Sequence, residues 1–366
     1  MTHPYLTLPA SAFWRTGVAG VDRHCFAGLY RPKAPLTRDT RVATAGSCFA
    51  QHIGAHLRLA GCTVLDAEPK PFAMPDAMAK SFGYGMYSAR YGNIYTSRQL
   101  LDLLHEITSG TPDPRFVWQK QDRFFDALRP TVEPEGMDSA VEVIAMRRAH
   151  LRKSADLLRQ TDLLIFTLGL TETWVDRATG RALPVCPGVV AGTFDPQDHA
   201  WVNLTHAQVL ADLVSCLTLL QAFNPAMHLL LTVSPVPLTA TASGDHVLSA
   251  TSWSKSTLRA AAGEFAASRP DVDYMPSYEL ITHPAAQPLA GGSWFDPNLR
   301  SVSAAGVARV MQFFLSAHQL TDTPLEQRWP DAGPADVATS EPDDAEDAVN
   351  CDEVLLDAFA TPAAPQ

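Results

Sequence analysis

A short turn after the first apolar run carries a serine and a cysteine where a nucleophile could work. Residues 42–45 form the run, and Gly46, Ser47 and Cys48 separate it from a helical stretch that begins near Phe49. Unpaired backbone N–H groups at a helix start stabilise developing negative charge. Ser47 is therefore a candidate nucleophile, and helix capping is the alternative reading of this serine. Cys48 is a second candidate nucleophile, although a cysteine at the start of such a helix more commonly packs as a small apolar side chain.

The elements that must position this turn follow the pattern of strands alternating with helices. Apolar runs begin at Val42, Cys62, Asp162, His228 and Val272. Amphipathic stretches cover residues 50–59, 98–106, 205–223, 254–267 and 304–317. This alternation predicts an α/β fold with a mostly parallel sheet. The turn then lies at the carboxyl end of the first strand, the edge at which open α/β sheets bind ligands.

A long stretch between the second and third predicted strands fits the alternation poorly. It is rich in aromatic residues, namely Phe82, Tyr84, Tyr87, Tyr91, Tyr95, Phe116, Trp118, Phe124 and Phe125. Disordered segments are poor in aromatics, so we expect a folded insertion over about residues 70–155 that covers the ligand edge of the sheet. The insertion interrupts a domain over residues 41–320, which follows an N-terminal extension over residues 1–40.

The segment 321–366 differs from the rest of the chain in composition. It holds 12 acidic residues and one arginine, with many prolines and alanines, and it predicts a disordered acidic tail. Near its end, Val354, Leu355, Ala358 and Phe359 fall on one face of a short helix. Two alternatives stay open for this stretch: an unstructured end, or a motif that docks on a protein partner or back on the body.

Charge and cysteine usage exclude several classes of function. The chain of 366 residues has a formal net charge of −11, which the tail alone accounts for, and residues 1–320 hold 27 basic and 27 acidic residues. A balanced body has no charge excess for binding nucleic acid or anionic membranes. The six cysteines are scattered, without metal-ligand spacing, so we expect neither a metal site nor a cofactor. No leader or long apolar run is evident, so a cytoplasmic location without membrane insertion is expected.

The motif Gly46-Ser47-Cys48-Phe49-Ala50 resembles the one that names the GSCFA family, which belongs with the SGNH or GDSL-like hydrolases. Four further stretches are similar to that family in the same order: YGNIYTSRQLLDLL from Tyr91, FTLGLTETW from Phe166, LTVSPVPLTAT from Leu231 and SKSTLR from Ser254. The resemblance implies a flavodoxin-like three-layer sandwich with the site at the strand ends. It also implies that Ser47 is the nucleophile.

The resemblance further implies the groups that hold the oxyanion. SGNH enzymes use a backbone glycine, and Gly92 matches it, followed by Asn93, whose amide could also donate. We expect the backbone amide of Ser47 or Cys48 to hold the oxyanion with them. In the next motif Thr171 stands where these enzymes usually carry an asparagine, and a threonine hydroxyl reaches less far. Glu172 follows it and could orient a histidine or a loop, while a solvated carboxylate is the alternative.

The sequence departs from the family pattern before the last helix. Aligned on the helix that follows, Asn298 and Ser301 stand where SGNH enzymes carry an aspartate and a histidine, and neither can act as a base near neutral pH. His246 and His283 lie in loops that we place at the strand ends. We favour His246 as the base because Asp245 is one of several polar neighbours that could fix the imidazole. An ordinary loop histidine is the alternative for both.

Two hypotheses follow for function. The first is a serine-dependent ester hydrolase or O-acyltransferase that acts on a small molecule or glycan, favoured by Trp174, Trp253 and Trp294 in loops beside the motifs, where they could stack on sugar rings. Burial in the core is the alternative for each tryptophan. The second is a catalytically retired SGNH fold that acts as a binding or scaffolding protein, with the acidic tail contacting a protein partner.

Overall fold

The computed structural model describes residues 3–21, 26, 28–288, 291–321 and 352–360. Its centre is a parallel sheet with the strand order β1-β4-β8-β9. The bounds are Val42–Gly46 for β1, Leu163–Leu168 for β4, His228–Val233 for β8 and Val272–Tyr274 for β9. The predicted strand from Cys62 is reduced to one parallel bridge between Val64 and Val42, on the free side of β1.

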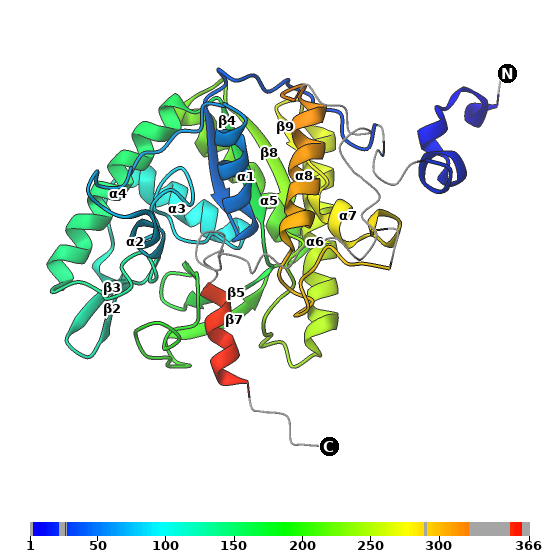
Figure 1. Cartoon of the computed structure of the whole chain (residues 1–366). Helices are drawn as coiled ribbons and strands as arrows, with labels where there is room; N and C mark the ends of the chain where they lie inside the picture. Colours follow the sequence, from blue (N-terminus) through cyan, green and yellow to red (C-terminus); the bar gives the residue numbers. More distant parts are fainter. Residues whose placement is uncertain (1–2, 22–25, 27, 289–290, 322–351, 361–366) are drawn as a thin grey trace.

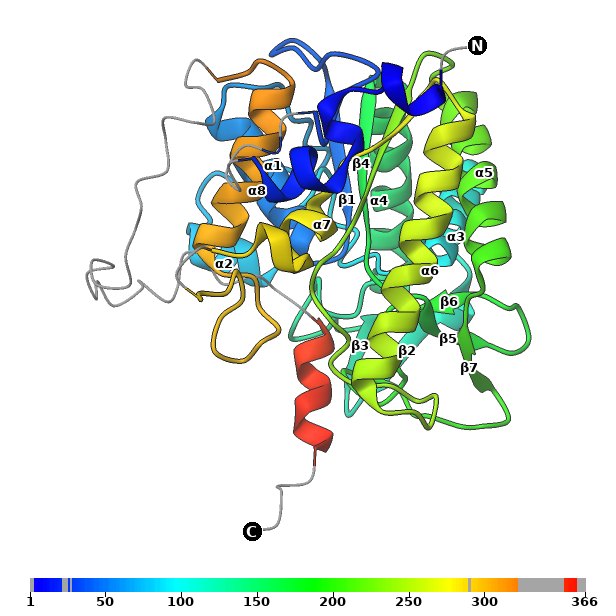
Figure 2. The same cartoon turned by 90° about the vertical axis from the view of Figure 1, so that its right-hand side faces the viewer.

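Helices cover both faces of this sheet (Figures 1 and 2). One layer contains α3 (Ser97–Ser109), α4 (Ala140–Gln160), α5 (His206–Phe223) and α6 (Val247–Ser268), and the other contains α1 (Phe49–Leu59), α7 (Ser277–Thr282) and α8 (Ala304–Ala317). Alternate strand residues enter the two cores, with Phe166 on one side and Ile165 on the other. Strands buried on both faces read as continuous apolar runs. The predicted α/β class with a mostly parallel sheet is confirmed.

Helix α5 is long and apolar enough to cross a membrane by length and composition alone. It packs against α3 and α6, and its buried side includes Val209, Leu213 and Leu220. Core helices of α/β proteins pass the same test.

The insertion differs from the predicted cap. Helix α4 leads directly into β4 and α3 packs on α5, so both belong to the helical layer. The remainder contains α2 (Asp76–Ser81) and the antiparallel hairpin of β2 (Val117–Lys120) and β3 (Arg123–Asp126). This hairpin shares a small core with a second antiparallel sheet of β6 (Ala182–Leu183), β5 (Glu172–Asp176) and β7 (His199–Asn203).

The two ends of the described chain lie on different sides of the molecule (Figure 1). Near the N-terminus are the short helices η1 (Pro4–Thr7), η2 (Ala10–Ala12) and η3 (Arg15–Ala19), while Tyr30 stacks on Phe314 of α8. At the other end, η7 (Asp352–Phe359) lies next to β5 and β7. The predicted disorder of residues 322–351 and 361–366 lies outside the described residues. Residues 352–360 dock back on the body through Asp352, which is buried, whereas Leu355, Ala358 and Phe359 of the predicted docking face are exposed.

Candidate active site

Ser47 lies in the turn between β1 and α1. Gly46 has a φ of +138°, and a Cβ there would lie 2.5 Å from the carbonyl oxygen of Thr167 in β4. The Ser47 N–H donates to the same oxygen at 3.1 Å, which fixes the turn to β4. The side chain of Ser47 is 3% exposed, and its Oγ has no hydrogen-bond partner among the described residues. Cys48, itself buried, is the N-cap of α1, so Ser47 does not serve as a capping residue.

Three loops meet at Ser47. The N–H of Ile94 donates to the carbonyl oxygen of Gly46 at 2.8 Å, and the N–H of Gly169 donates to the carbonyl oxygen of Tyr95 at 2.9 Å. A Cβ at Gly169 would lie only 2.9 Å from the Cβ of Ser47. The segments after β1, before α3 and after β4 therefore surround the serine, as the family motifs imply.

Asn93 presents a fixed hydrogen-bond donor in this site. Its Oδ1 accepts from the Tyr87 hydroxyl at 2.5 Å and from Nε2 of Gln51 at 3.3 Å. Two donors on Oδ1 identify it as the acceptor end of the amide, so Nδ2 is the donor end. Nδ2 donates at 3.0 Å to Oδ2 of Asp352, and Asn93 is 3% exposed. The amide thus binds an anionic oxygen, the type of atom that a tetrahedral intermediate would present.

Gly92 precedes this amide in a left-handed conformation, with a φ of +72°. A Cβ at this position would lie 3.5 Å from the Cβ of Arg129, an ordinary contact. The backbone angle rather than crowding therefore favours glycine here. The role of the Gly92 N–H as an oxyanion donor stays a prediction.

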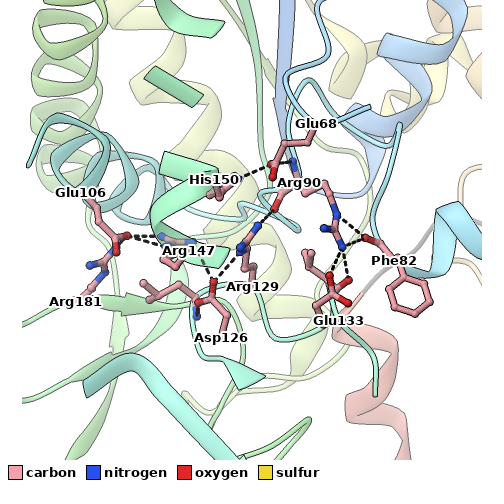
Figure 3. Close-up of polar contacts among 12 residues, drawn as sticks. Glu68, Phe82, Arg90, Glu106, Asp126, Arg129, Glu133, Arg147, His150 and Arg181 are labelled. Atoms are coloured by element: carbon pink, nitrogen blue, oxygen red, sulfur yellow. Dashed lines mark hydrogen bonds and ion pairs between the residues drawn. The ribbon is translucent and has the colours of Figure 1, made fainter. Parts of the chain in front are cut away.

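A buried ion network supports the loop that carries both residues (Figure 3). Oε2 of Glu68 accepts from the N–H of Arg90 at 2.9 Å, and Nη1 of Arg129 donates to the carbonyl oxygen of Arg90 at 3.0 Å. Arg129 also pairs with Asp126 at 2.7 Å. Because Arg90 is two residues before Gly92, these bonds fix the backbone of the loop next to Gly92 and Asn93.

The same network contains a histidine that the sequence analysis did not single out. Nδ1 of His150 lies 2.6 Å from Oε2 of Glu68, and the imidazole is fully buried. Burial and the nearby charge of Arg129 lower the pKa of His150 to about 4. Burial opposes ionisation of Glu68, but the hydrogen bond and charge of His150 outweigh it and lower that pKa to about 2. At neutral pH the carboxylate is therefore charged and the imidazole neutral.

Thr171 and Glu172 lie where β4 leads into β5. Thr171 is fully buried, its N–H donates to Oγ of Ser254 at 3.0 Å, and its own Oγ1 has no partner within the described chain. Oε1 of Glu172 accepts from the Thr241 hydroxyl at 2.7 Å, and Oε2 accepts from Nε1 of Trp201 at 3.1 Å. Glu172 thus bonds to the loop that precedes His246, through Thr241, and to β7, through Trp201.

The structure does not bring either candidate histidine to Ser47. Nδ1 of His246 accepts from the N–H of Leu248 at 3.2 Å, and Nδ1 of His283 accepts from the N–H of Ala285 at 3.1 Å. Both side chains are exposed and cap helices, the ordinary role that was the alternative for each. A neutral imidazole that accepts at Nδ1 carries its proton on Nε2, so that nitrogen cannot accept a serine proton in this state.

Asn298 and Ser301, which replace the aspartate and histidine of the family pattern, form a polar turn. Nδ2 of Asn298 donates to the Ser301 hydroxyl at 3.0 Å, and Oδ1 of Asn298 accepts from the N–H of Ser301. These bonds stabilise the turn before α8, and the aspartate and histidine of the family pattern are not needed for it.

Lys255 is a further buried group of the site that the sequence analysis left without a role. It follows Ser254 on α6 and is 1% exposed, and its Nζ donates to the carbonyl oxygen of Gly169 at 2.6 Å. Because Gly169 contacts Ser47, this lysine holds one of the three loops in place. The family-like stretch SKSTLR was the only signal for it.

A cavity of about 560 Å³ opens beside these loops. Leu170 lines it and also packs with Tyr95, so the cavity adjoins the loops around Ser47. Its walls include Trp174, Phe194 and Trp201. The rings of Trp174 and Phe194 pack edge to face, with 5.1 Å between their centroids. The sequence analysis missed Trp201, which lies on a strand it did not predict.

The other two tryptophans of the sequence analysis lie elsewhere. Trp253 is 52% exposed on α6 and does not line the cavity. Trp294 is 3% exposed, and its Nε1 donates to the carbonyl oxygen of Ala286. Trp294 is thus a core residue, the alternative given for it.

Fold and site together define an α/β protein with a buried serine and an anion-binding amide at the carboxyl edge of a parallel sheet. The model of the GSCFA family matches residues 41–314. The chain belongs to the GSCFA family, which confirms the resemblance found in the sequence.

Structural comparison gives a distant similarity. The chain is similar to the crystal structure of a protein described as a "putative GDSL-like lipase" from Parabacteroides merdae ATCC 43184. The two are 14% identical, the match covers 79% of this chain and 100% of the other, and the TM-score is 0.34. No curated protein matches the chain.

Proposed function

We propose that this protein is a serine-dependent ester hydrolase or O-acyltransferase of the SGNH type. One observation carries the proposal: the Ser47 hydroxyl is buried without a hydrogen-bond partner among the described residues, in a turn that adjoins the anion-binding amide of Asn93. A buried hydroxyl left unpaired is costly, so its presence calls for an explanation. A role in catalysis explains why the fold retains it.

The proposed reaction forms an acyl-enzyme. Oγ of Ser47 attacks the ester carbonyl carbon, and the carbonyl oxygen becomes an oxyanion held by the Gly92 N–H and Nδ2 of Asn93. Collapse breaks the bond to the alcohol, which leaves with the proton that Ser47 gave up. Water or a sugar hydroxyl then takes the acyl group. The Ser47 N–H is already bonded to Thr167, so these two donors supply the stabilisation, each about 3 kcal/mol.

His246 remains the proposed base. To accept the serine proton it has to release the N–H of Leu248 and turn toward Ser47, because it caps α6 in the present state. Its exposed position leaves room for that movement, and Glu172 holds Thr241 five residues before it. The base and the nucleophile would then meet only when substrate is bound, a common difference between free and occupied active sites.

The cavity supports the proposed substrate class. Its aromatic walls suit an acyl chain or the apolar face of a sugar ring, and Glu172 lies among its lining residues. An acylated carbohydrate or glycoconjugate fits this combination of flat rings and one carboxylate.

A retired hydrolase fold that acts as a binding protein is the second candidate. The observation that favours it is that no imidazole bonds to Ser47 within the described residues, while Asn298 and Ser301 replace the usual base. Such a protein would bind its ligand through the same cavity without turnover.

A fluorophosphonate probe separates the two candidates. The probe labels only an activated nucleophile, so we expect labelling that maps to residue 47 and is lost in Ser47→Ala. Cys48→Ala is the matched control, since it alters the adjacent side chain and should keep the label. Absence of labelling in the wild-type protein, and in variants of its C-terminal segment, would favour the binding protein.

A further inference from the structure

The described C-terminal segment begins at the groups that form the proposed site. Figures 1 and 2 show η7 extending from the face of the molecule that carries β5 and β7. Asp352, its first residue, is 2% exposed. The carboxylate accepts from Nδ2 of Asn93 at 3.0 Å and from the Thr131 hydroxyl at 2.6 Å. A carboxylate is this deeply buried only when hydrogen bonds compensate it, so this is a built contact.

The same segment also reaches the cavity. Leu356 and Phe359 are among its lining residues, together with Trp174 and Trp201. Phe359 is 69% exposed and therefore lies at the mouth, and Leu355 points to solvent with 43% exposure. The sequence analysis expected Leu355 on the docking face, and the structure uses Leu356 in its place. The side chain of Val354 lies outside the described residues.

One short segment thus contacts both parts of the proposed substrate site: it bonds to the Asn93 amide and forms part of the wall of the adjacent cavity. An anionic oxygen lies on the Asn93 amide, where the oxyanion of the intermediate would form, and apolar side chains line the adjacent cavity. A second negative charge at that amide would repel the first. An ester could not complete the reaction while Asp352 is bound.

We propose that residues 352–359 are an intramolecular pseudo-substrate that occupies the site, with Asp352 as its anchor and Leu356 and Phe359 as its apolar arm. This inference rests on the proposed function, because it assigns Asn93 to the oxyanion. The segment is tethered to the body, so its effective concentration at the site is on the order of millimolar. A contact too weak to persist between separate molecules can therefore keep the site occupied.

The first arm of the test uses the full-length chain. Asp352→Ala should raise the rate of fluorophosphonate labelling at Ser47 at least tenfold. Thr131→Val removes one anchoring bond of Asp352 and keeps the bond from Asn93, so it should raise the labelling rate less. The matched control is Asp357→Ala, which removes an exposed carboxylate from the same helix and should leave the rate unchanged. A labelling rate in Asp352→Ala equal to that of the wild type would overturn the inference.

The second arm does not depend on catalysis. A synthetic peptide of residues 352–360 is added to the full-length Asp352→Ala/Leu356→Ala variant, and binding is followed by tryptophan fluorescence. We expect saturable binding at least tenfold tighter than to the wild-type protein, and at least tenfold weaker binding of the peptide that carries alanine for Asp352. If no variant is labelled, the proposed function fails, but this arm still tests the inference. Peptide binding supports the inference that residues 352–359 bind at the site, and absence of binding overturns it.

Discussion

Nδ2 of Asn93 lies 3.0 Å from Oδ2 of Asp352, although 259 positions of sequence separate the two residues. Oδ1 of Asn93 accepts from Tyr87 and Gln51, which orients the amide, and Nδ2 donates to Asp352. The contact shows that this part of the β1 edge accepts negative charge. It links the proposed catalytic role of the edge to the segment that occupies it.

Replacing Asn93 should impair turnover far more than it impairs folding. Asn93→Ala is expected to lower kcat/KM about a hundred- to a thousandfold, because one oxyanion donor is worth about 3 to 4 kcal/mol. Asn93→Asp keeps the shape of the side chain and the acceptor for Tyr87 but removes the donor. It should lower kcat/KM as much as Asn93→Ala does. The measurement is made in the Asp352→Ala background too, since Asn93 also binds that residue. Activity within threefold of the parent would remove Asn93 from the oxyanion site.

Gly46→Ala tests whether the turn before Ser47 depends on glycine. The new Cβ would meet the Thr167 carbonyl oxygen at 2.5 Å and the Thr167 nitrogen at 2.7 Å, and backbone cannot move aside cheaply. We expect a loss of at least about 3 kcal/mol in the free energy of unfolding. Gly85→Ala is the control, because Gly85 also has a positive φ but no atom within 4 Å of a Cβ. Similar denaturation midpoints for the two variants would refute the crowding argument.

His150 makes the protein sensitive to acid. Its pKa in the folded state is about 4, below the ordinary value of 6.5, so between these two values the unfolded chain binds a proton that the folded chain does not. The free energy of unfolding should therefore fall as the pH drops from 6.5 toward 4. Burial lowers the pKa of His318 to about 4 as well, so it adds to the same window.

The corresponding variants separate the two histidines. His150→Gln should flatten the dependence of Tm on pH between 6.5 and 4, and adding His318→Gln should flatten it further. Both effects are read from thermal melts in a pH series, after correction for the stability of each variant at pH 7.5. An unchanged slope in the double variant would show that other groups cause the acid sensitivity.

The identity of the base is tested by two matched variants. His246→Gln should lower kcat a hundredfold or more with little change in KM, because glutamine keeps a polar side chain but takes no proton near neutral pH. His283→Gln should leave kcat unchanged, since that residue caps η5 and packs against Trp14. Loss of activity in His283→Gln with a fully active His246→Gln would reverse the assignment.

Local patterns predict most of the fold because the strands are buried on both faces. The runs from Val42, Asp162 and His228 become β1, β4 and β8. Helix α4 escaped prediction for a physical reason: its buried side includes Arg147, His150 and Ser154, whose polar atoms hide the apolar period. Their burial depends on partners such as Glu68 and Glu106, which lie far away in the sequence.

The site could be predicted only in part. Ser47, Gly92 and Asn93 belong to local motifs, and backbone bonds such as that from Ile94 to Gly46 then bring them together. Asp352 could not be assigned, because an acidic, proline-rich surrounding predicts disorder whatever one carboxylate does. The role of Asp352 depends on its contact with Asn93, which is 259 positions away in the sequence.

The central claim is that Ser47 is the nucleophile, and the most direct measurement is the turnover of a short-chain aryl acetate by Ser47→Ala in the Asp352→Ala background. We predict that kcat falls to the rate without enzyme while Tm stays within about 2 °C of the parent, since the hydroxyl makes no hydrogen bond with a described residue that the alanine would lose. Retained turnover would contradict the claim, and a fall in Tm of 10 °C would show that the hydroxyl serves the fold.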